Sequence, residues 1–176
     1  MKAAKTPKPF IRYEPLKAWE VVIVVIYALI TVVIAMSRLV LNLSFRRDAI
    51  IFYGVVPQLC FLFFLYVSLR NFRFYLIWLC FGVIHFILFL CFKGPSEFQM
   101  IGNPSGLLAN TLPLLFLFQA LRYYSVNILH REFVSPAKGE DGDLIENKKP
   151  TGTDYLISVI YFGTWFGLTL LSASHS

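Results

Sequence analysis

The residues best suited to chemistry in this sequence are uncharged polar side chains that lie inside long apolar runs. They are Thr31, Gln58, His85, Asn110 and Thr164, with Thr111 and Gln119 nearby. Each of the five comes from a different run and falls at a similar depth within it. Such a layer can form a small-ligand site, a hydrated path or a cofactor pocket. It can also serve only as interhelical hydrogen bonding, which contributes about 0.6 kcal/mol per bond on average. The sequence favours the structural role.

His85 is the member of this set that could ligate a haem or a metal ion. Haem held by two histidines needs a second imidazole at a compatible depth. The other histidines, His130 and His175, flank the fourth and fifth runs at opposite ends. Because neither can meet His85 within one chain, we predict no cofactor and no metal site. We expect a neutral imidazole that is bonded to Gln58 or to a backbone carbonyl.

Signatures of catalysis and of ion coupling are missing from the sequence. It has no G-x-S-x-G, no H-E-x-x-H, no phosphate-binding glycine loop and no paired carboxylates within the runs. Its cysteines, Cys60, Cys80 and Cys91, lie in apolar runs without a C-x-x-C pair and are typical of packing residues. Ion-coupled carriers place ionisable groups at depth, and no run has one near its centre. These features favour a protein that is not an enzyme.

One motif indicates close helix packing. Gly163 and Gly167 form a G-x-x-x-G within the last apolar run. Glycines one turn apart allow the backbone of another helix to approach closely. The sequence does not decide whether that helix belongs to the same chain or to a partner.

The elements that must position these residues are membrane-spanning helices. Hydrophobic residues make up 57% of the 176-residue chain and charged residues only 15%, whereas soluble domains carry about 25% charged residues. A spanning helix needs roughly 20 apolar residues. We therefore predict an all-α integral membrane protein with a bundle of about five transmembrane helices. The predicted spans are about 18–40, 49–69, 74–92, 106–123 and 154–172, with kinks at Pro57 and Pro113.

The distribution of basic residues predicts the orientation of the spans. Five spans with a cytoplasmic N-terminus place 12 Lys and Arg residues on the inner side and 4 on the outer side, as the positive-inside rule prefers. The basic tail 1–17 and the loop 124–153 would then be cytoplasmic, and residues 173–176 would lie outside. We expect the protein in the cytoplasmic (inner or plasma) membrane. Since the net charge of +6 is explained by the ends of the spans, we expect no nucleic-acid partner.

Three functions are consistent with these features. The first is a non-catalytic polytopic membrane subunit that anchors or completes a larger membrane assembly. The second is a small homo-oligomeric channel or pore, lined by Gln58 and His85. The third is a membrane enzyme or carrier for a lipid-like substrate, using His85 and Asn110. The partners expected are membrane lipid and other membrane protein subunits or copies of the same chain.

Overall fold

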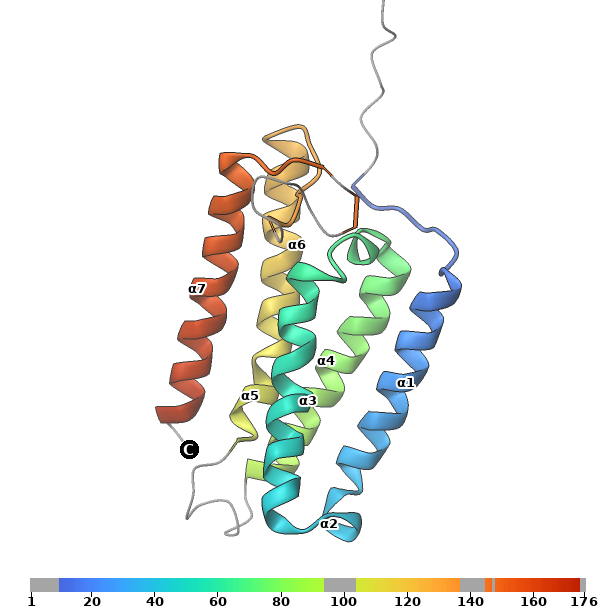
Figure 1. Cartoon of the computed structure of the whole chain (residues 1–176), viewed down its shortest axis with the longest axis vertical. Coiled ribbons are helices and arrows are strands. Elements are labelled where there is room, and N and C mark those ends of the chain that lie inside the picture. Colours follow the sequence, from blue (N-terminus) through green and yellow to red (C-terminus); the bar gives the residue numbers. More distant parts are fainter. Residues whose placement is uncertain (1–9, 94–103, 137–144, 147, 175–176) are drawn as a thin grey trace, which may run out of the picture.

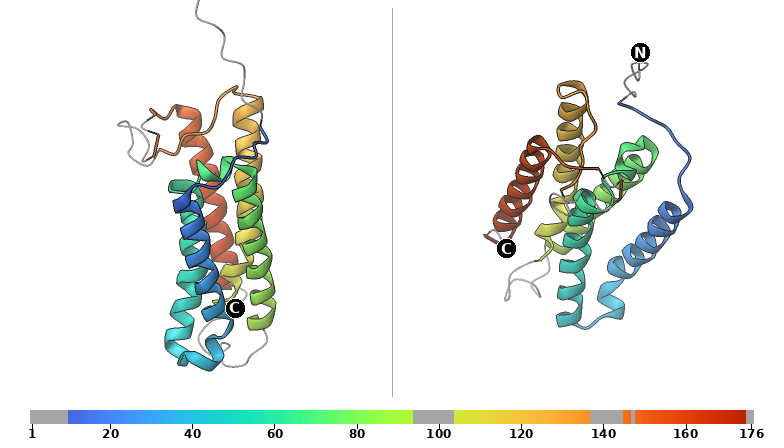
Figure 2. Two further views of the ribbon diagram at one scale, coloured as in Figure 1. Left: turned by 90° about the vertical axis from the view of Figure 1, so that its right-hand side faces the viewer. Right: turned by 45° about the horizontal axis from the view of Figure 1, so that its top comes forward.

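Five helical rods lie side by side in the computed structural model, which describes residues 10–93, 104–136, 145–146 and 148–174 (Figure 1). Four rods are built on α1 (Ala18–Ala35), α3 (Leu43–Phe63), α4 (Phe72–Lys93) and α7 (Gly152–Ser174); the fifth is α5 (Gly106–Ala109) followed by α6 (Thr111–Asn127). Short turns of helix, α2 (Ser37–Val40) and η1 (Ser68–Arg70), lie in two of the connections. The predicted all-helical class is confirmed. The rods α1 and α7 form opposite edges of the bundle (Figures 1 and 2).

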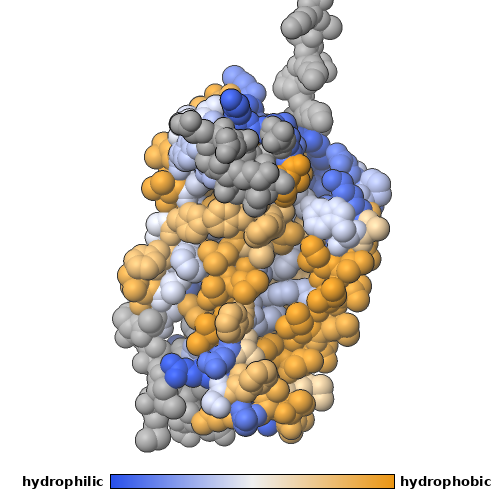
Figure 3. Space-filling view, viewed as in Figure 1, coloured by the Kyte–Doolittle hydropathy of each residue, from blue (hydrophilic) through white to orange (hydrophobic). Residues whose placement is uncertain are grey.

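Within the described part of the chain, three helices are long and apolar enough to cross a membrane: α1, α4 and residues Gly152–Ser172 of α7. The other two rods run alongside them but have different compositions. Helix α3 carries Arg46, Arg47 and Asp48 near its start. Helix α6 has only 17 residues because the rod is interrupted at Asn110. Figure 3 shows apolar side chains over the middle of one face of the molecule, with hydrophilic side chains toward both of its ends.

Local chemistry explains where the helices break relative to the predicted spans. The first predicted span, 18–40, is divided between α1 and α2 at Met36. Helix α3 starts at Leu43, earlier than the predicted 49, because Oδ1 of Asn42 caps it by accepting from the backbone N–H of Phe45 at 3.0 Å. The rod of α5 and α6 breaks at Asn110, so Pro113 falls in the first turn of α6, where its missing N–H is tolerated.

The helices at the two edges start with a similar capping arrangement. At α1, the backbone N–H of Lys17 donates to the Glu20 carboxylate at 2.8 Å. At α7, the N–H of Thr151 donates to the Asp154 carboxylate, also at 2.8 Å. In both cases an acidic side chain in the first turn reaches back to the residue before the helix, and its charge complements the helix dipole.

An extended segment, residues 10–17, crosses one end of the bundle before α1 begins; we call it the strap. Asn71, which lies between η1 and α4, holds it in place. Its Nδ2 donates to the Glu14 carbonyl at 2.9 Å, and its Oδ1 accepts from the Glu14 N–H at 3.2 Å. The N–H of Phe72 also donates to the Arg12 carbonyl at 2.8 Å. The bundle thus has a strap end, and at the other end α2 joins α1 to α3 (Figure 1).

The described residues form two apolar core clusters. The larger cluster, nearer the strap, includes Phe61, Phe74 and Trp78. The smaller cluster, nearer α2, includes Ile50 and Leu88. The polar residues predicted at mid-depth belong to neither cluster. Of these residues, Gln58, His85 and Thr111 lie where α3, α4 and α6 are packed together, and these three are the centre of the candidate site.

Candidate functional site

A chain of hydrogen bonds runs across the bundle and links all five rods. It starts at Tyr27 of α1, whose Oη lies 2.7 Å from Nε2 of His85 in α4. Nδ1 of His85 lies 2.8 Å from Oγ1 of Thr111 in α6. Nε2 of Gln58 in α3 donates to the same Thr111 oxygen at 3.1 Å. The chain ends where the Trp165 indole N–H of α7 donates to Oε1 of Gln58, also at 3.1 Å.

Gln58 has the most connections in this chain. Its Nε2 also donates to the Leu107 carbonyl in α5 at 2.7 Å, and its own backbone carbonyl accepts from the Tyr161 hydroxyl at 2.8 Å. Both Gln58 and His85 are 0% exposed. A buried polar group costs stability unless it is hydrogen-bonded. Here the side-chain amide of Gln58 and both ring nitrogens of His85 have hydrogen-bond partners.

Pro57 explains why α1 is bonded to α3 at this level. A proline within a helix has no N–H, so it leaves the carbonyl four residues earlier without its usual partner. That carbonyl belongs to Tyr53, and the Tyr27 hydroxyl donates to it at 3.3 Å. The Tyr53 ring stacks on Tyr27 with centroids 5.1 Å apart, and its hydroxyl lies 2.7 Å from Oγ1 of Thr31. The interrupted helix is thereby tied to its neighbour.

The predicted polar residues have different environments in the structure. The prediction for His85 was a bond to Gln58 or to a backbone carbonyl; its ring nitrogens instead contact Tyr27 and Thr111, and Thr111 links it to Gln58. Thr31 is buried and connects to the chain through Tyr53 and Tyr27. Asn110 is buried at some distance, where its Nδ2 donates to the Ser172 hydroxyl of α7 at 3.0 Å.

Two further predicted polar residues take no part in this series of hydrogen bonds. The Thr164 hydroxyl donates to the Ile160 carbonyl of its own helix at 2.9 Å, so it contributes nothing to the layer. Gln119 donates to the Leu69 carbonyl at 3.2 Å, nearer the strap end.

Sequence reasoning missed the aromatic members, Tyr27, Tyr53 and Trp165. A buried tyrosine hydroxyl or indole N–H usually finds a hydrogen-bond partner. Tyr27 precedes Thr31 by one helical turn, and Trp165 follows Thr164 directly. Counting polar aromatic tips together with polar side chains would have identified both positions.

The direction of this series of hydrogen bonds limits its possible functions. The series runs from α1 to α7 across the helices and not along them, and its polar groups bond to one another. Among the described residues, no three His, Cys, Asp or Glu side chains are placed to hold a metal ion. The arrangement fixes the relative positions of the five rods at mid-depth.

A second polar cluster closes the strap end. The Glu132 carboxylate pairs with Arg12 of the strap, with Arg70 at 3.6 Å and with Arg122 of α6 at 3.2 Å. Burial raises the pKa of this carboxyl, but the hydrogen bond from Arg122 and the charges of the three arginines outweigh that effect and hold the pKa below its ordinary value. Arg70 also pairs with Glu146 at 2.9 Å. The cluster joins the strap to three other parts of the chain.

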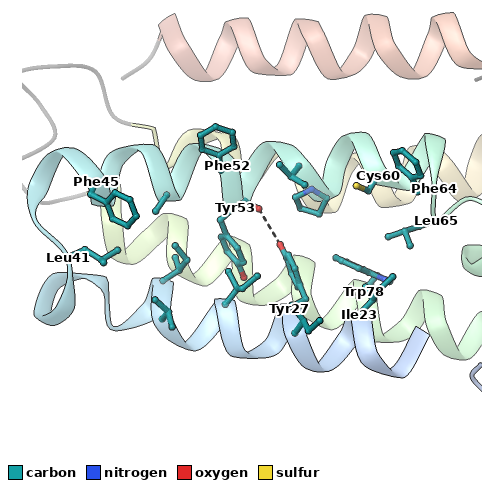
Figure 4. A pocket seen from close by; sticks show the side chains of 17 residues that line it. Ile23, Tyr27, Leu41, Phe45, Phe52, Tyr53, Cys60, Phe64, Leu65 and Trp78 are labelled. Atoms are coloured by element: carbon teal, nitrogen blue, oxygen red, sulfur yellow. Dashed lines mark hydrogen bonds between the residues drawn. The ribbon is translucent and has the colours of Figure 1, made fainter. Parts of the chain in front are cut away.

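A long apolar groove of about 730 Å³ separates α1 from α3 (Figure 4). Ile23 and Ile30 are among the α1 residues in its walls. Phe45 of α3 and Phe64, which directly follows α3, lie toward its two ends. Trp78 of α4 also lines the groove, and its side chain is 2% exposed. The Trp78 indole N–H is buried and has no hydrogen-bond partner among the described residues.

The G-x-x-x-G motif does not pack inside the described part of the chain. A methyl group added at Gly163 or Gly167 would meet nothing within 4 Å beyond its own helix. Gly163 instead lies in a shallow hollow of about 470 Å³ on α7, between Phe162 and Phe166. Gly82 of α4 behaves differently, because a methyl group there would come within 2.9 Å of Leu112.

Comparison with known proteins gives no match: neither a protein-family model, nor a curated protein, nor a solved structure resembles this chain.

Proposed function

We propose that this protein is a non-catalytic membrane subunit with five transmembrane helices that completes a larger assembly through the outer face of α7. The observation that carries the proposal is the placement of the G-x-x-x-G motif. Gly163 and Gly167 make no close approach within the described chain, and they lie on a helix that is long and apolar enough to span a membrane. Small residues on a spanning helix let a partner helix approach closely.

The hydrogen-bond chain supports a structural role for the mid-depth polar residues. Gln58 and His85, the residues that would line a pore, are buried and bonded to Thr111 in the plane across the bundle. A conducting path would need polar groups turned toward an axis along the rods. The same bonding occupies both nitrogens of the imidazole that an enzyme or carrier would use. The geometry therefore favours the subunit over the pore and over the enzyme.

Particle mass tests this function. The protein is extracted from its native membrane under mild conditions, and the mass and composition of the particle are determined. We expect a particle of fixed composition that contains more than one polypeptide. Replacing Gly163 and Gly167 together by Leu should reduce it to the single chain. Val83→Leu, which adds volume to an outward-facing residue of α4, is the matched control and should leave the particle intact. A wild-type particle with one chain would refute the proposal.

We further propose that all five rods span the membrane, with the strap end in the cytoplasm. The parallel course of α3 and of α5 with α6 beside α1, α4 and α7 supports this arrangement (Figure 1). The excess of Lys and Arg that this places inside also supports it.

Labelling with a membrane-impermeant maleimide tests the orientation in a chain whose native cysteines are replaced by Ala. Three rods separate Ser44 from Lys149, and both residues are exposed. In intact cells, Ser44→Cys should be labelled and Lys149→Cys should not. The reverse pattern would invert the orientation, and labelling of both would refute the span count.

A further inference from the structure

We infer that the hydrogen bonds across the bundle all run in one direction, from the Trp165 indole to the Tyr53 carbonyl, and that they hold His85 as the neutral tautomer with its proton on Nε2. These bonds carry the inference by themselves, without the proposed role as a subunit. Both ends of the series have a fixed polarity, and each group between them has a limited number of protons. Together these two conditions leave one consistent arrangement.

The orientation of the Gln58 amide is fixed by two groups that cannot exchange roles. The Trp165 indole N–H can only donate, and it lies 3.1 Å from Oε1. The Leu107 carbonyl can only accept, and it lies 2.7 Å from Nε2. Exchanging the oxygen and the nitrogen of the amide would place donor against donor and acceptor against acceptor. The second proton of the NH2 group therefore goes to the Thr111 oxygen, 3.1 Å away.

Thr111 passes this direction on to His85. Its hydroxyl has one proton, and its oxygen already accepts from Gln58. A threonine hydroxyl in a helix often donates to the carbonyl four residues earlier, as Thr164 does here. For Thr111 that carbonyl belongs to Leu107 and receives the Gln58 amide instead, and no bond from Thr111 to it occurs among the described residues. The Thr111 proton therefore goes to Nδ1 of His85, 2.8 Å away, and Nδ1 is an acceptor.

The opposite end of the series is fixed by the Tyr53 carbonyl, which Pro57 leaves without its helical partner. The Tyr27 hydroxyl donates its single proton to this carbonyl at 3.3 Å, as the dashed line in Figure 4 shows. The Tyr27 oxygen is then an acceptor, 2.7 Å from Nε2 of His85. Because Nδ1 accepts and a neutral imidazole has one proton, that proton is on Nε2 and is donated to Tyr27. The two ends thus lead to the same tautomer.

The reverse direction would leave buried groups unpaired. With the His85 proton on Nδ1, Thr111 would accept from both His85 and Gln58, and no group of the series would accept its own proton. The Tyr27 proton would turn to Nε2, and the Tyr53 carbonyl would lose its donor. A buried polar group without a partner is costly, and both Gln58 and His85 are 0% exposed. The forward direction pairs every group in the series.

This proton pattern decides what the imidazole can do. Binding a metal ion or accepting a proton requires a free lone pair on a ring nitrogen. Nε2 carries the proton, and the lone pair of Nδ1 receives the Thr111 hydroxyl. His85 is therefore a connector that accepts from α6 and donates to α1. A ligand could use the ring only by displacing Thr111.

The position of the proton is measured by ¹⁵N NMR on the full-length protein in lipid bilayers. Histidine labelled at Nδ1 alone or at Nε2 alone is incorporated, and His130→Gln and His175→Gln leave His85 as the only histidine. A protonated and an unprotonated ring nitrogen differ in ¹⁵N shift, and only the first is split by an attached proton. We expect the proton on Nε2. A proton on Nδ1 would overturn the inference.

One substitution should reverse the direction. Gln58→Glu keeps the shape of the side chain but replaces the NH2 group by a single O–H, because a carboxyl group buried at this depth is neutral. That O–H donates to the Leu107 carbonyl, and the same oxygen accepts from the Thr111 hydroxyl. The Thr111 oxygen must then accept from Nδ1. The proton of His85 should therefore move from Nε2 to Nδ1.

Gln119→Glu is the matched control. Gln119 donates to the Leu69 carbonyl at 3.2 Å and takes no part in this series, so the His85 proton should stay on Nε2. A thermal unfolding transition is recorded for each variant to establish that it is folded. A folded Gln58→Glu protein with the His85 proton still on Nε2 would overturn the inference. If Gln58→Glu does not fold, the wild-type spectrum alone decides between the two tautomers.

Discussion

Oη of Tyr27 and Nε2 of His85 lie 2.7 Å apart, and this contact joins the edge helix α1 to α4 in the middle of the bundle. The two residues are 58 positions apart in the sequence. The imidazole also reaches Thr111 at 2.8 Å, so α1 is connected through it to α6. If the bond stabilises the fold, the two side chains should be energetically coupled.

A double-mutant cycle with Tyr27→Phe and His85→Phe measures that coupling. We expect a coupling free energy of about 0.6 kcal/mol, and at most about 1.7 kcal/mol, as for other hydrogen bonds between transmembrane helices. Unfolding in mixed micelles provides the free energies. Tyr75→Phe is the control, because no hydrogen bond of the Tyr75 hydroxyl occurs among the residues described. Strictly additive costs for the pair would show that the contact contributes nothing to stability.

Two glycine substitutions should have opposite effects on the isolated chain. Gly82→Ala forces a methyl group to within 2.9 Å of Leu112, so we expect it to lower the free energy of unfolding by about 1–3 kcal/mol. Gly163→Ala meets no other helix, and the helix propensity of Ala should raise the free energy of unfolding by up to about 1 kcal/mol. Both are measured on the same monomeric preparation. Equal effects at the two positions would contradict the packing described for them.

The strap should be released when Asn71 loses its donor. Asn71→Asp places a carboxylate oxygen opposite the Glu14 carbonyl, where Nδ2 now donates at 2.9 Å. If the substitution lowers the free energy of releasing the strap by about 1.4 kcal/mol, the population of released strap that trypsin can cleave increases tenfold. Trypsin should then cleave after Arg12 and Lys17 about ten times faster. Asn127→Asp, an identical change at an exposed position near the same end, should leave that cleavage rate unaltered.

Acid should weaken the cluster at the strap end. The pKa of Glu132 is lower in the folded protein than in the unfolded chain, so its stabilising effect is complete above the unfolded value, about 4.3, and is lost as the pH falls through the folded value. We expect the unfolding temperature to fall with pH in this window. Glu132→Gln should lower the unfolding temperature at neutral pH and flatten this dependence. The slope that remains is expected from Glu146, whose pKa is also lowered by its positive partners.

Glu14→Gln is the control for the acid experiment. Glu14 belongs to the same strap, but its side chain is exposed. This variant should keep the wild-type pH dependence. A Glu132→Gln variant with the full wild-type dependence would mean that other carboxylates control stability at low pH.

Composition and run length by themselves determined the class of the fold. A chain that is 57% hydrophobic and divided by short polar breaks has few alternatives to a bundle of apolar helices, because lipid leaves every backbone group to be satisfied within its own helix. The sequence also identified Gln58 and His85 as residues of the polar layer, because a polar group within an apolar run must find a partner.

Only the tertiary structure decided which partners those residues have. Whether a side chain points into the bundle or away from it depends on the rotation of its helix, and a run that is apolar all round carries no signal for that rotation. The sequence therefore could not assign a direction to Thr164 or Gly163. The bond from Tyr27 to the Tyr53 carbonyl likewise depends on Pro57, on another helix, and on the side-by-side position of α1 and α3. The direction of these side chains and the bond from Tyr27 both depend on long-range packing, which the local order of residues does not specify.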